Sequence, residues 1–166
     1  MLKAYSKFLD VLEKIEKAIL AITVAIMIVV IVYQVVLRYI FSAANSWSEE
    51  LARYLFIYNV MLGSAIAIRR NSHLQVDAIT SHLSPKLQRI STIVATLLGI
   101  VFLVFLMMYS ITLCQTGNKT MSAGLPISMT IPYASMPIGA VLMILTSIEV
   151  ILKKIEELRT GKEADA

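Results

Sequence analysis

Four long stretches of apolar residues, almost free of charge, constrain this chain more strongly than any other feature of its sequence. They occupy about half of its 166 residues. A helix needs about 20 apolar residues to cross the hydrocarbon core of a bilayer. A water-soluble domain of this length cannot bury a hydrophobic content of 58%. We therefore expect an all-α membrane protein with four transmembrane helices and amphipathic interfacial extensions.

The spans are expected at about residues 18–37, 47–68, 86–114 and 130–152, within a single membrane domain over residues 1–166. The second span needs a separate argument, because its uncharged part, residues 54–68, is only about 22 Å long at 1.5 Å per residue. With four spans, 12 of the 15 Lys and Arg residues lie on one side of the membrane and 3 on the other, whereas three spans give at best 10 and 5. The positive-inside rule therefore predicts four spans, with both termini and the 69–89 loop in the cytoplasm.

The first seventeen residues place apolar side chains at helical spacing, with oppositely charged pairs four residues apart on the other side. This pattern predicts an interfacial helix that leads into the first span. A cleaved signal peptide is not expected, because the first apolar stretch is longer than a typical signal h-region and follows seventeen residues of mixed charge.

Proline and glycine mark the expected boundaries of the third and fourth helices. Ser84 and Pro85 suit the N-cap and first position of the third helix, and residues 115–128 are expected to form an irregular loop. Pro132 suits the first turn of the fourth helix, whereas Pro137 is expected to lie inside that helix and kink it. The helix is expected to continue past the membrane with an apolar stripe of Ile148, Ile151, Leu152, Ile155 and Leu158.

The sequence offers little for catalysis or metal binding. Cys114 is the only cysteine, which excludes an intrachain disulfide and a cysteine-cluster metal site. His73 and Asp77 share a face of a short helix expected in the 69–89 loop, but two residues do not make a metal site, and a surface pair or a loop-ordering hydrogen bond is favoured. We expect no enzyme activity, no metal and no cofactor. We also expect no nucleic-acid partner, because the basic residues flank the spans, where they set the membrane orientation.

The densest local pattern lies where the second span begins. Ser46 and Glu49 form a capping box, Trp47 suits the membrane interface, and Glu49 and Glu50 complement the helix dipole. Arg53 is not explained by this pattern, because it lies where the hydrocarbon begins. Two interpretations remain open: a local ion pair whose side chains reach the interface, or a charged contact with a partner subunit.

Small and polar residues within the spans predict contacts between helices. Small residues at helical spacing allow backbones to approach closely, and those expected at packing faces include Gly63, Ala67, Gly99, Ser135 and Gly139. Gln34 and Asn59 are expected to form hydrogen bonds between helices. A carrier would be expected to show interrupted helices at matching positions in two halves, and only the fourth span has an internal proline. The pattern therefore favours a supporting subunit over a complete transporter.

Several of these motifs together resemble the small membrane subunit (Q, DctQ-type) of tripartite ATP-independent periplasmic (TRAP) transporters. The block Trp-x-Glu-Glu-x-x-Arg followed by His-x-x-Val-Asp is the most specific part of the resemblance. The similar segments are Arg38 and Tyr39, Trp47 to Phe56, Leu62 to Ala65, Arg69, His73 to Asp77, Pro126 to Ser128, Ile131 to Tyr133 and Met136 to Gly139.

The resemblance implies a bacterial inner-membrane protein that pairs with a large multispan M subunit, while a periplasmic binding protein delivers an organic acid. It implies that sodium drives uptake and that the M subunit, not this chain, holds the sodium and substrate sites. The Q subunit would support the static part of the M subunit and help to dock the binding protein. Sialic acid, favoured slightly, and C4-dicarboxylates are among the implied substrates. Residues expected to contact the companion subunit or lipid are Arg38, Trp47, Glu49, Glu50, Arg53, Gly63, Arg69, His73 and Asp77.

Two alternatives belong to other classes of protein. A self-contained four-helix transporter or channel would use Glu49 or Glu50 as its coupling carboxylate. A membrane anchor of an enzyme would be expected to carry haem-ligating histidines within its spans, and both histidines of this chain lie in the 69–89 loop.

Overall fold

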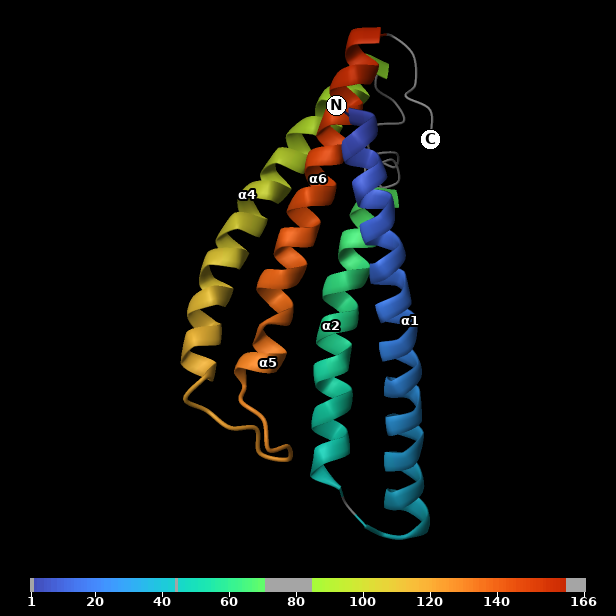
Figure 1. Ribbon diagram of the computed structural model, residues 1–166, viewed down its shortest axis with the longest axis vertical. Coiled ribbons are helices and arrows are strands. Elements are labelled where there is room, and N and C mark those ends of the chain that lie inside the picture. The colour runs from blue at the N-terminus through green and yellow to red at the C-terminus, as the bar shows by residue number, and fades with distance from the viewer. Residues whose placement is uncertain (1, 44, 71–84, 161–166) are drawn as a thin grey trace.

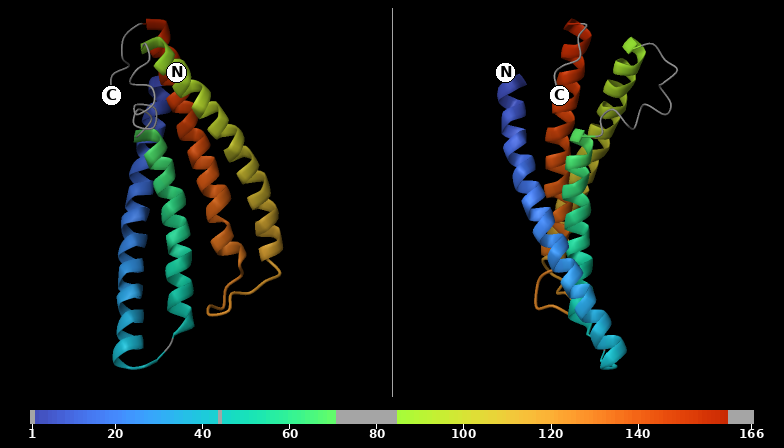
Figure 2. Two further views of the ribbon diagram at one scale, coloured as in Figure 1. Left: turned by 180° about the vertical axis from the view of Figure 1, so that it is seen from behind. Right: turned by 90° about the vertical axis from the view of Figure 1, so that its right-hand side faces the viewer.

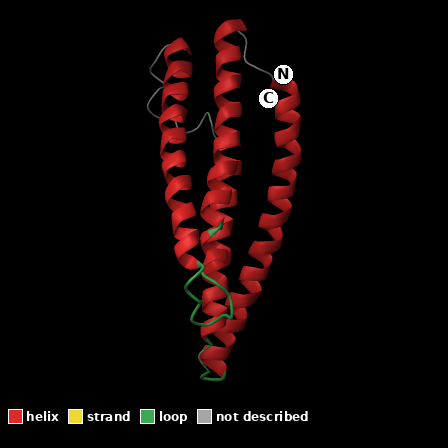
Figure 3. Ribbon diagram, turned by 60° about the vertical axis from the view of Figure 1, so that its left-hand side comes forward, coloured by secondary structure: helices red, strands yellow, loops and turns green. Residues whose placement is uncertain are grey.

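The computed structural model describes residues 2–43, 45–70 and 85–160. Four helical segments in this part of the chain are long and apolar enough to cross a membrane, which confirms the expected fold class. The described residues form helices and loops without a named strand (Figure 3). The helices are α1 (Leu2–Ile40), α2 (Ser46–Arg70), α4 (Pro85–Gly117), the short α5 (Thr130–Tyr133) and α6 (Ser135–Thr160).

The long helices lie side by side in the order α1, α2, α6, α4 (Figures 1 and 2). α2 packs between α1 and α6, and α6 packs between α2 and α4. Within the described ranges the backbone of α4 lies close only to those of α5 and α6 among the helices. The Leu103 side chain of α4 shares a buried apolar cluster with Met143 of α6 and Ala65 of α2. The arrangement is thus a layer with two broad faces and not a closed four-helix bundle.

α1 is one uninterrupted helix of 39 residues. The expected interfacial helix and the first span are therefore continuous, because no glycine or proline lies between Leu2 and Ile40 to interrupt them. At 1.5 Å per residue α1 is about 58 Å long, well beyond the roughly 30 Å of a hydrocarbon core. Its first turns extend past that core or are accommodated by tilt. Leu9, in this extension, is buried against the neighbouring helices.

The prolines of the fourth span lie where the sequence predicts them. Pro132 lies in α5, in the first turn of the Thr130–Arg159 span, and Pro137 lies within that span, where it has no N–H to donate to the Tyr133 carbonyl one turn earlier. The helical run is interrupted at Ala134, between α5 and α6, where Ser135 donates its hydroxyl to the Pro132 carbonyl at 2.7 Å. The irregularity expected from Pro137 therefore falls in the turn before the proline, at the single residue Ala134, whose backbone stays in the right-handed helical region (φ −61°, ψ −20°).

Toward the C-terminal end of α6, charged side chains are buried and apolar side chains are exposed, which is the reverse of the arrangement predicted from the sequence. Glu149 is 1% exposed, Lys154 6% and Glu157 5%, so the buried side chains there include charged ones. Ile148, Leu152 and Ile155 of the expected apolar stripe are exposed instead. The sequence pattern was interpreted with the apolar side inward, as in water. In a membrane protein the apolar side can face lipid or a partner, and the charged side then lies between helices.

The small-residue predictions have mixed outcomes. Gly139 lets α6 approach α2 closely, since a Cβ built on it would lie 2.6 Å from Met61 Cβ. A Cβ on Gly63 would make an ordinary 3.5 Å contact with a Leu20 side-chain carbon. Ala67 was expected at a packing face but is exposed, because that face of α2 points away from its neighbours.

Gly99 also departs from the expectation. A Cβ built there would meet no atom of the described residues within 4 Å, so Gly99 makes no close helix approach in this part of the chain. By contrast, Asn59 of α2 accepts a hydrogen bond from the Thr23 hydroxyl of α1. The expected hydrogen bond between two helices is therefore present at Asn59.

Candidate functional site

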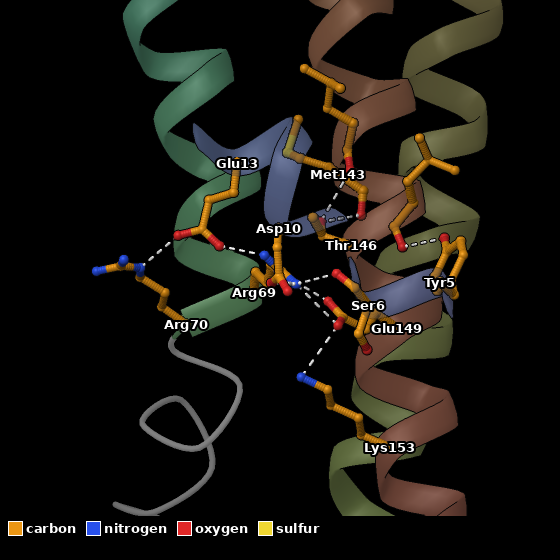
Figure 4. Close-up of polar contacts among 12 residues, drawn as sticks. Tyr5, Ser6, Asp10, Glu13, Arg69, Arg70, Met143, Thr146, Glu149 and Lys153 are labelled. Carbon is orange, nitrogen blue, oxygen red and sulfur yellow. Dashed lines mark hydrogen bonds and ion pairs between the residues drawn. The ribbon is translucent and has the colours of Figure 1, made fainter. Parts of the chain in front are cut away.

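Arg69, in the last turn of α2, lies at the centre of an ion-pair cluster that joins three helices (Figure 4). Its Nε donates to Glu149 Oε2 of α6 at 2.6 Å. On α1, its Nη1 donates to Glu13 Oε2 at 2.5 Å and its Nη2 to Asp10 Oδ1 at 2.6 Å. Nη2 also donates to the backbone carbonyl of Ser6 at 3.2 Å. We call these four charged residues, Asp10, Glu13, Arg69 and Glu149, the Arg69 cluster.

Further cations surround the Arg69 cluster. Arg70 Nε lies 2.9 Å from Glu13 Oε1, and Lys17 also pairs with Glu13. Lys153 Nζ lies 3.3 Å from Glu149 Oε1. The carboxylates therefore have cationic partners on both sides, which offsets the cost of removing their charges from water.

Three of the four side chains of the Arg69 cluster are largely withdrawn from solvent, whereas that of Asp10 is 60% exposed. The side chains of Arg69 and Glu149 are 9% and 1% exposed, and that of Glu13 is 13% exposed. An arginine at the C-terminal end of α2 is also favoured by the negative end of the helix dipole. The planar guanidinium presents several donors at fixed angles, so a single side chain serves carboxylates of both α1 and α6.

A second, smaller ion-pair group joins α4 to α6 at the same end of the molecule. Arg89 Nη1 of α4 donates to the Glu157 carbonyl at 2.9 Å. Lys154 Nζ lies 2.9 Å from Glu157 Oε2. All four long helices are therefore linked by charged side chains at this end.

At the opposite end, Glu50 of α2 holds the loop between α4 and α5. Its carboxylate accepts hydrogen bonds from the Ser122 hydroxyl, from the Gly124 N–H at 2.9 Å and from the Ala123 N–H at 3.3 Å. A Cβ on Gly124 would lie 2.9 Å from the Ser46 carbonyl carbon, so the loop approaches the start of α2 backbone to backbone. Residues 118–129, with Glu50, are called the Glu50 loop below.

Two tyrosines of α2 extend this contact along the helix. The Tyr54 hydroxyl lies 3.0 Å from Ser122 Oγ. The Tyr58 hydroxyl donates to the Ile131 carbonyl of α5 at 2.6 Å. Glu50, Tyr54 and Tyr58 are spaced four apart, so they lie on one face of α2. That face binds the segment leading into α6.

The remaining residues of the predicted site lie outside both groups. Glu49 pairs with Arg53 at 3.2 Å, and these side chains are 53% and 63% exposed. Trp47 packs its ring 5.9 Å from that of Tyr33, and Arg38 lines a pocket beside the α1–α2 turn. His73 and Asp77 lie outside the described residues.

The chemistry of these groups is that of structural contacts. Among the described residues, no group of three or more His, Cys, Asp and Glu side chains could hold a metal ion. Arg69 was among the contact residues predicted from the sequence, whereas its partners Asp10, Glu13 and Glu149 were not. One signal for Glu149 was available, since it is the single charge between Ile148 and Leu152 in an otherwise apolar run.

The chain matches the family model described as the DctQ component of tripartite ATP-independent periplasmic transporters over residues 27–157. The "Sialic acid TRAP transporter small permease protein SiaQ" of Vibrio cholerae is 28% identical over 140 residues, which cover 84% of this chain and 80% of the relative.

Two longer relatives match over only part of their length. The "Sialic acid TRAP transporter permease protein SiaT" of Haemophilus influenzae is 28% identical over 120 residues, 72% of this chain and 20% of the relative. The "Isethionate TRAP transporter permease protein DctMQ" of Oleidesulfovibrio alaskensis is 30% identical over 136 residues, 77% of this chain and 21% of the relative. The chain therefore spans about a fifth of the length of these two proteins.

Proposed function

Because the chain belongs to the DctQ component family of tripartite ATP-independent periplasmic transporters, we propose that it acts as the small membrane subunit of an organic-acid uptake system. It is a multi-pass membrane protein and a transport component, not an enzyme. The observation that carries the proposal is the family match over residues 27–157, which includes α2, α4, α5, most of α6 and the Glu50 loop.

The partner is a large multispan M subunit. Support comes from the two longer relatives, in which the segment similar to this chain makes up about a fifth of a single permease protein. The layer also leaves large apolar side chains uncovered, among them Leu98 and Phe102 of α4 and Ile148 of α6. Apolar surface of this kind is satisfied by lipid or by a companion within the membrane.

The role of this chain is to support the static part of the M subunit. The Arg69 cluster joins α1, α2 and α6 through hydrogen bonds to charged groups, which are among the stronger hydrogen bonds in proteins. The sodium and substrate sites belong to the M subunit. In the described residues, neither linked end offers a metal-binding cluster.

The Glu50 loop is the part of this chain that helps to dock a periplasmic binding protein. The orientation rests on the 12 to 3 distribution of Lys and Arg, which places both termini in the cytoplasm and residues 118–129 in the periplasm. The membrane is then the bacterial inner membrane. Hydrogen bonds from Ser122, Ala123 and Gly124 to Glu50 hold the loop against α2 and give it a defined surface.

The substrate is an organic acid, with sialic acid favoured and a C4-dicarboxylate as the second candidate. Support for sialic acid comes from the names of two relatives that each cover more than two thirds of this chain. The isethionate relative shows that a similar segment also accompanies a different acid. A supporting subunit does not itself select the acid.

A self-contained transporter that couples through Glu49 or Glu50 is less well supported. Glu49 pairs with Arg53, and Glu50 is bonded to the loop, both within the first two turns of α2. A coupling carboxylate would need to be reached from both sides of the membrane in turn, whereas these two lie at one end of the layer.

Affinity purification from the native host tests the proposal. The tagged chain should bring down one large polytopic protein in a fixed ratio. Proteoliposomes should take up sialic acid only when they hold both subunits, with the binding protein and a sodium gradient present. A homodimer of this chain that transports an organic acid unaided would overturn the proposal.

A further inference from the structure

A pocket of about 220 Å³ lies between the end of α1 and the start of α2. It is lined by Gln34, Arg38, Ala43, Asn45, Ser46 and Glu49. Ser42, two residues after the end of α1, adopts a left-handed backbone (φ 51°). The N–H groups of both Phe41 and Ala43 return to the Leu37 carbonyl. The pocket is a feature of this turn and takes no part in the Arg69 cluster or the Glu50 loop.

Arg38 gives this pocket a positive charge that is exposed and has no counter-ion among the described residues. No described residue forms an ion pair or side-chain hydrogen bond with the Arg38 guanidinium, although Glu49 lines the same pocket and is paired instead with Arg53. The first turn of α2 begins at Ser46, and the backbone N–H groups of a first turn have no partner within their helix. With the positive end of the α2 dipole, these groups favour an anion beside Arg38.

The surroundings place this pocket at the depth of lipid headgroups. Tyr33 and Trp47 pack against each other beside it, and such aromatic side chains gather at membrane interfaces. The adjoining end of α1 exposes Tyr39, Ile40 and Phe41, which are 79%, 70% and 66% exposed. An apolar turn of this kind is suited to the boundary between headgroups and acyl chains and not to open water.

We propose that this pocket binds the phosphate of a phospholipid headgroup. Arg38 supplies two parallel N–H donors, the geometry that guanidinium groups commonly use on phosphate. The side chains of Asn45 and Ser46 and the start of α2 supply further donors. Glu49 at the edge of the pocket disfavours a headgroup of greater negative charge and favours one that also carries an ammonium group. The ligand is therefore a zwitterionic phospholipid, and phosphatidylethanolamine is the probe.

Native mass spectrometry of the delipidated full-length chain in detergent tests the site. Phosphatidylethanolamine is titrated into the wild type, Arg38→Gln and the matched control Lys119→Gln, which removes one positive charge from the loop at the same end of the molecule. Loss of hydrogen bonds to a charged group should weaken binding by about tenfold or more in Arg38→Gln. Lys119→Gln should bind as the wild type does. Trp47, the only tryptophan in the sequence, adjoins Ser46, so its fluorescence should respond to the lipid in the wild type and in Lys119→Gln but not in Arg38→Gln.

Three further measurements separate the possible ligands. Phosphatidylglycerol should bind the wild type more weakly than phosphatidylethanolamine, and inorganic phosphate should not displace the lipid. Ala43→Leu keeps Arg38 but fills the pocket, so it should also weaken lipid binding. If Arg38→Gln does not fold, Ala43→Leu tests whether the lipid binds in this pocket. Equal affinity of Arg38→Gln and Lys119→Gln overturns the site. Tight, Arg38-dependent binding of inorganic phosphate or a preference for phosphatidylglycerol overturns the zwitterionic lipid as its ligand.

Discussion

Arg69 of α2 and Glu149 of α6 form a two-point contact, with Nε to Oε2 at 2.6 Å and Nη2 to Oε1 at 3.2 Å. Both side chains are almost fully withdrawn from solvent, at 9% and 1% exposed. They lie 80 residues apart in the sequence and connect the two central helices of the layer. Because three carboxylates bind Arg69, this one side chain connects α2 to both α1 and α6.

Removal of Arg69 is expected to destabilise the protein strongly. Arg69→Ala leaves the carboxylates of Asp10, Glu13 and Glu149 without their shared cation, and the loss of one partner from a buried pair costs about 3–5 kcal/mol. The unfolding of detergent-solubilised protein, followed by circular dichroism, measures the change. Arg53→Ala is the matched control, because its pair with Glu49 is exposed and worth about 0.2–1 kcal/mol. Equal losses in the two variants would contradict the assigned role of the Arg69 cluster.

Arg69→Lys should restore only part of this stability. A lysine keeps the charge but lacks the planar set of donors with which Arg69 reaches Glu149 and both acidic residues of α1. Its unfolding transition is expected between those of Arg69→Ala and the wild type. Full recovery with lysine would show that charge alone suffices.

Glu50→Ala is expected to release the Glu50 loop while leaving the helices in place. The Ala123 and Gly124 N–H groups lose their acceptor, so their hydrogen exchange should accelerate by about tenfold or more. Amide exchange with mass spectrometric detection measures this directly. Glu49→Ala is the control, because Glu49 contacts Arg53 and not the loop. Unchanged exchange at both amides in Glu50→Ala would rule out the proposed restraint.

Two glycine substitutions should have opposite effects. Gly139→Ala places a Cβ 2.6 Å from Met61 Cβ, so α2 and α6 must separate, at a cost of about 1–3 kcal/mol. Gly99→Ala adds a methyl group where no described atom lies within 4 Å and should stabilise α4 by about 0.5–1 kcal/mol. Thermal unfolding in one detergent compares them. A loss at Gly99 similar to that at Gly139 would indicate that a second protein packs on α4.

The proposed orientation predicts the labelling of single cysteines. In a Cys114→Ser background, Lys119→Cys should react with a membrane-impermeant maleimide in intact spheroplasts, because the 118–129 loop is placed in the periplasm. Lys7→Cys should react only after the membrane is permeabilised. The reverse pattern would invert the topology without changing the fold.

The four helices could be predicted from the sequence because their signal is local. Each span is an apolar run bounded by charge, glycine or proline, and the start of α4 at Pro85 coincides with the first helical position expected for that proline. The irregularity near Pro137 could also be predicted, because a proline lacks the N–H that would bond the carbonyl one turn earlier. The sequence does not show that this irregularity is confined to Ala134.

The partners of Arg69 could not be predicted, since they lie 56 to 80 residues away along the chain. Asp10 and Glu13 each have a lysine four residues on, which suggested exposed local pairs. The Glu13–Lys17 pair does form, yet Glu13 also binds Arg69, because the same face of α1 packs against α2. Hydropathy identifies which segments enter the membrane, but it does not specify how four such helices are arranged.

The links at the two ends of α2 have a mechanical consequence. Glu50 binds the loop that leads into α6, and Arg69 binds Glu149 of α6 itself. At 1.5 Å per residue these two points are about 28 Å apart, close to the thickness of a hydrocarbon core. With these contacts in place, α2 cannot slide along α6 unless the hydrogen bonds of Glu50 and of Arg69 lengthen at the same time. If a neighbouring domain moved across the membrane beside them, α2 and α6 would therefore resist it as one rigid unit. The force parallel to the helices would be borne by the contacts at both ends of α2.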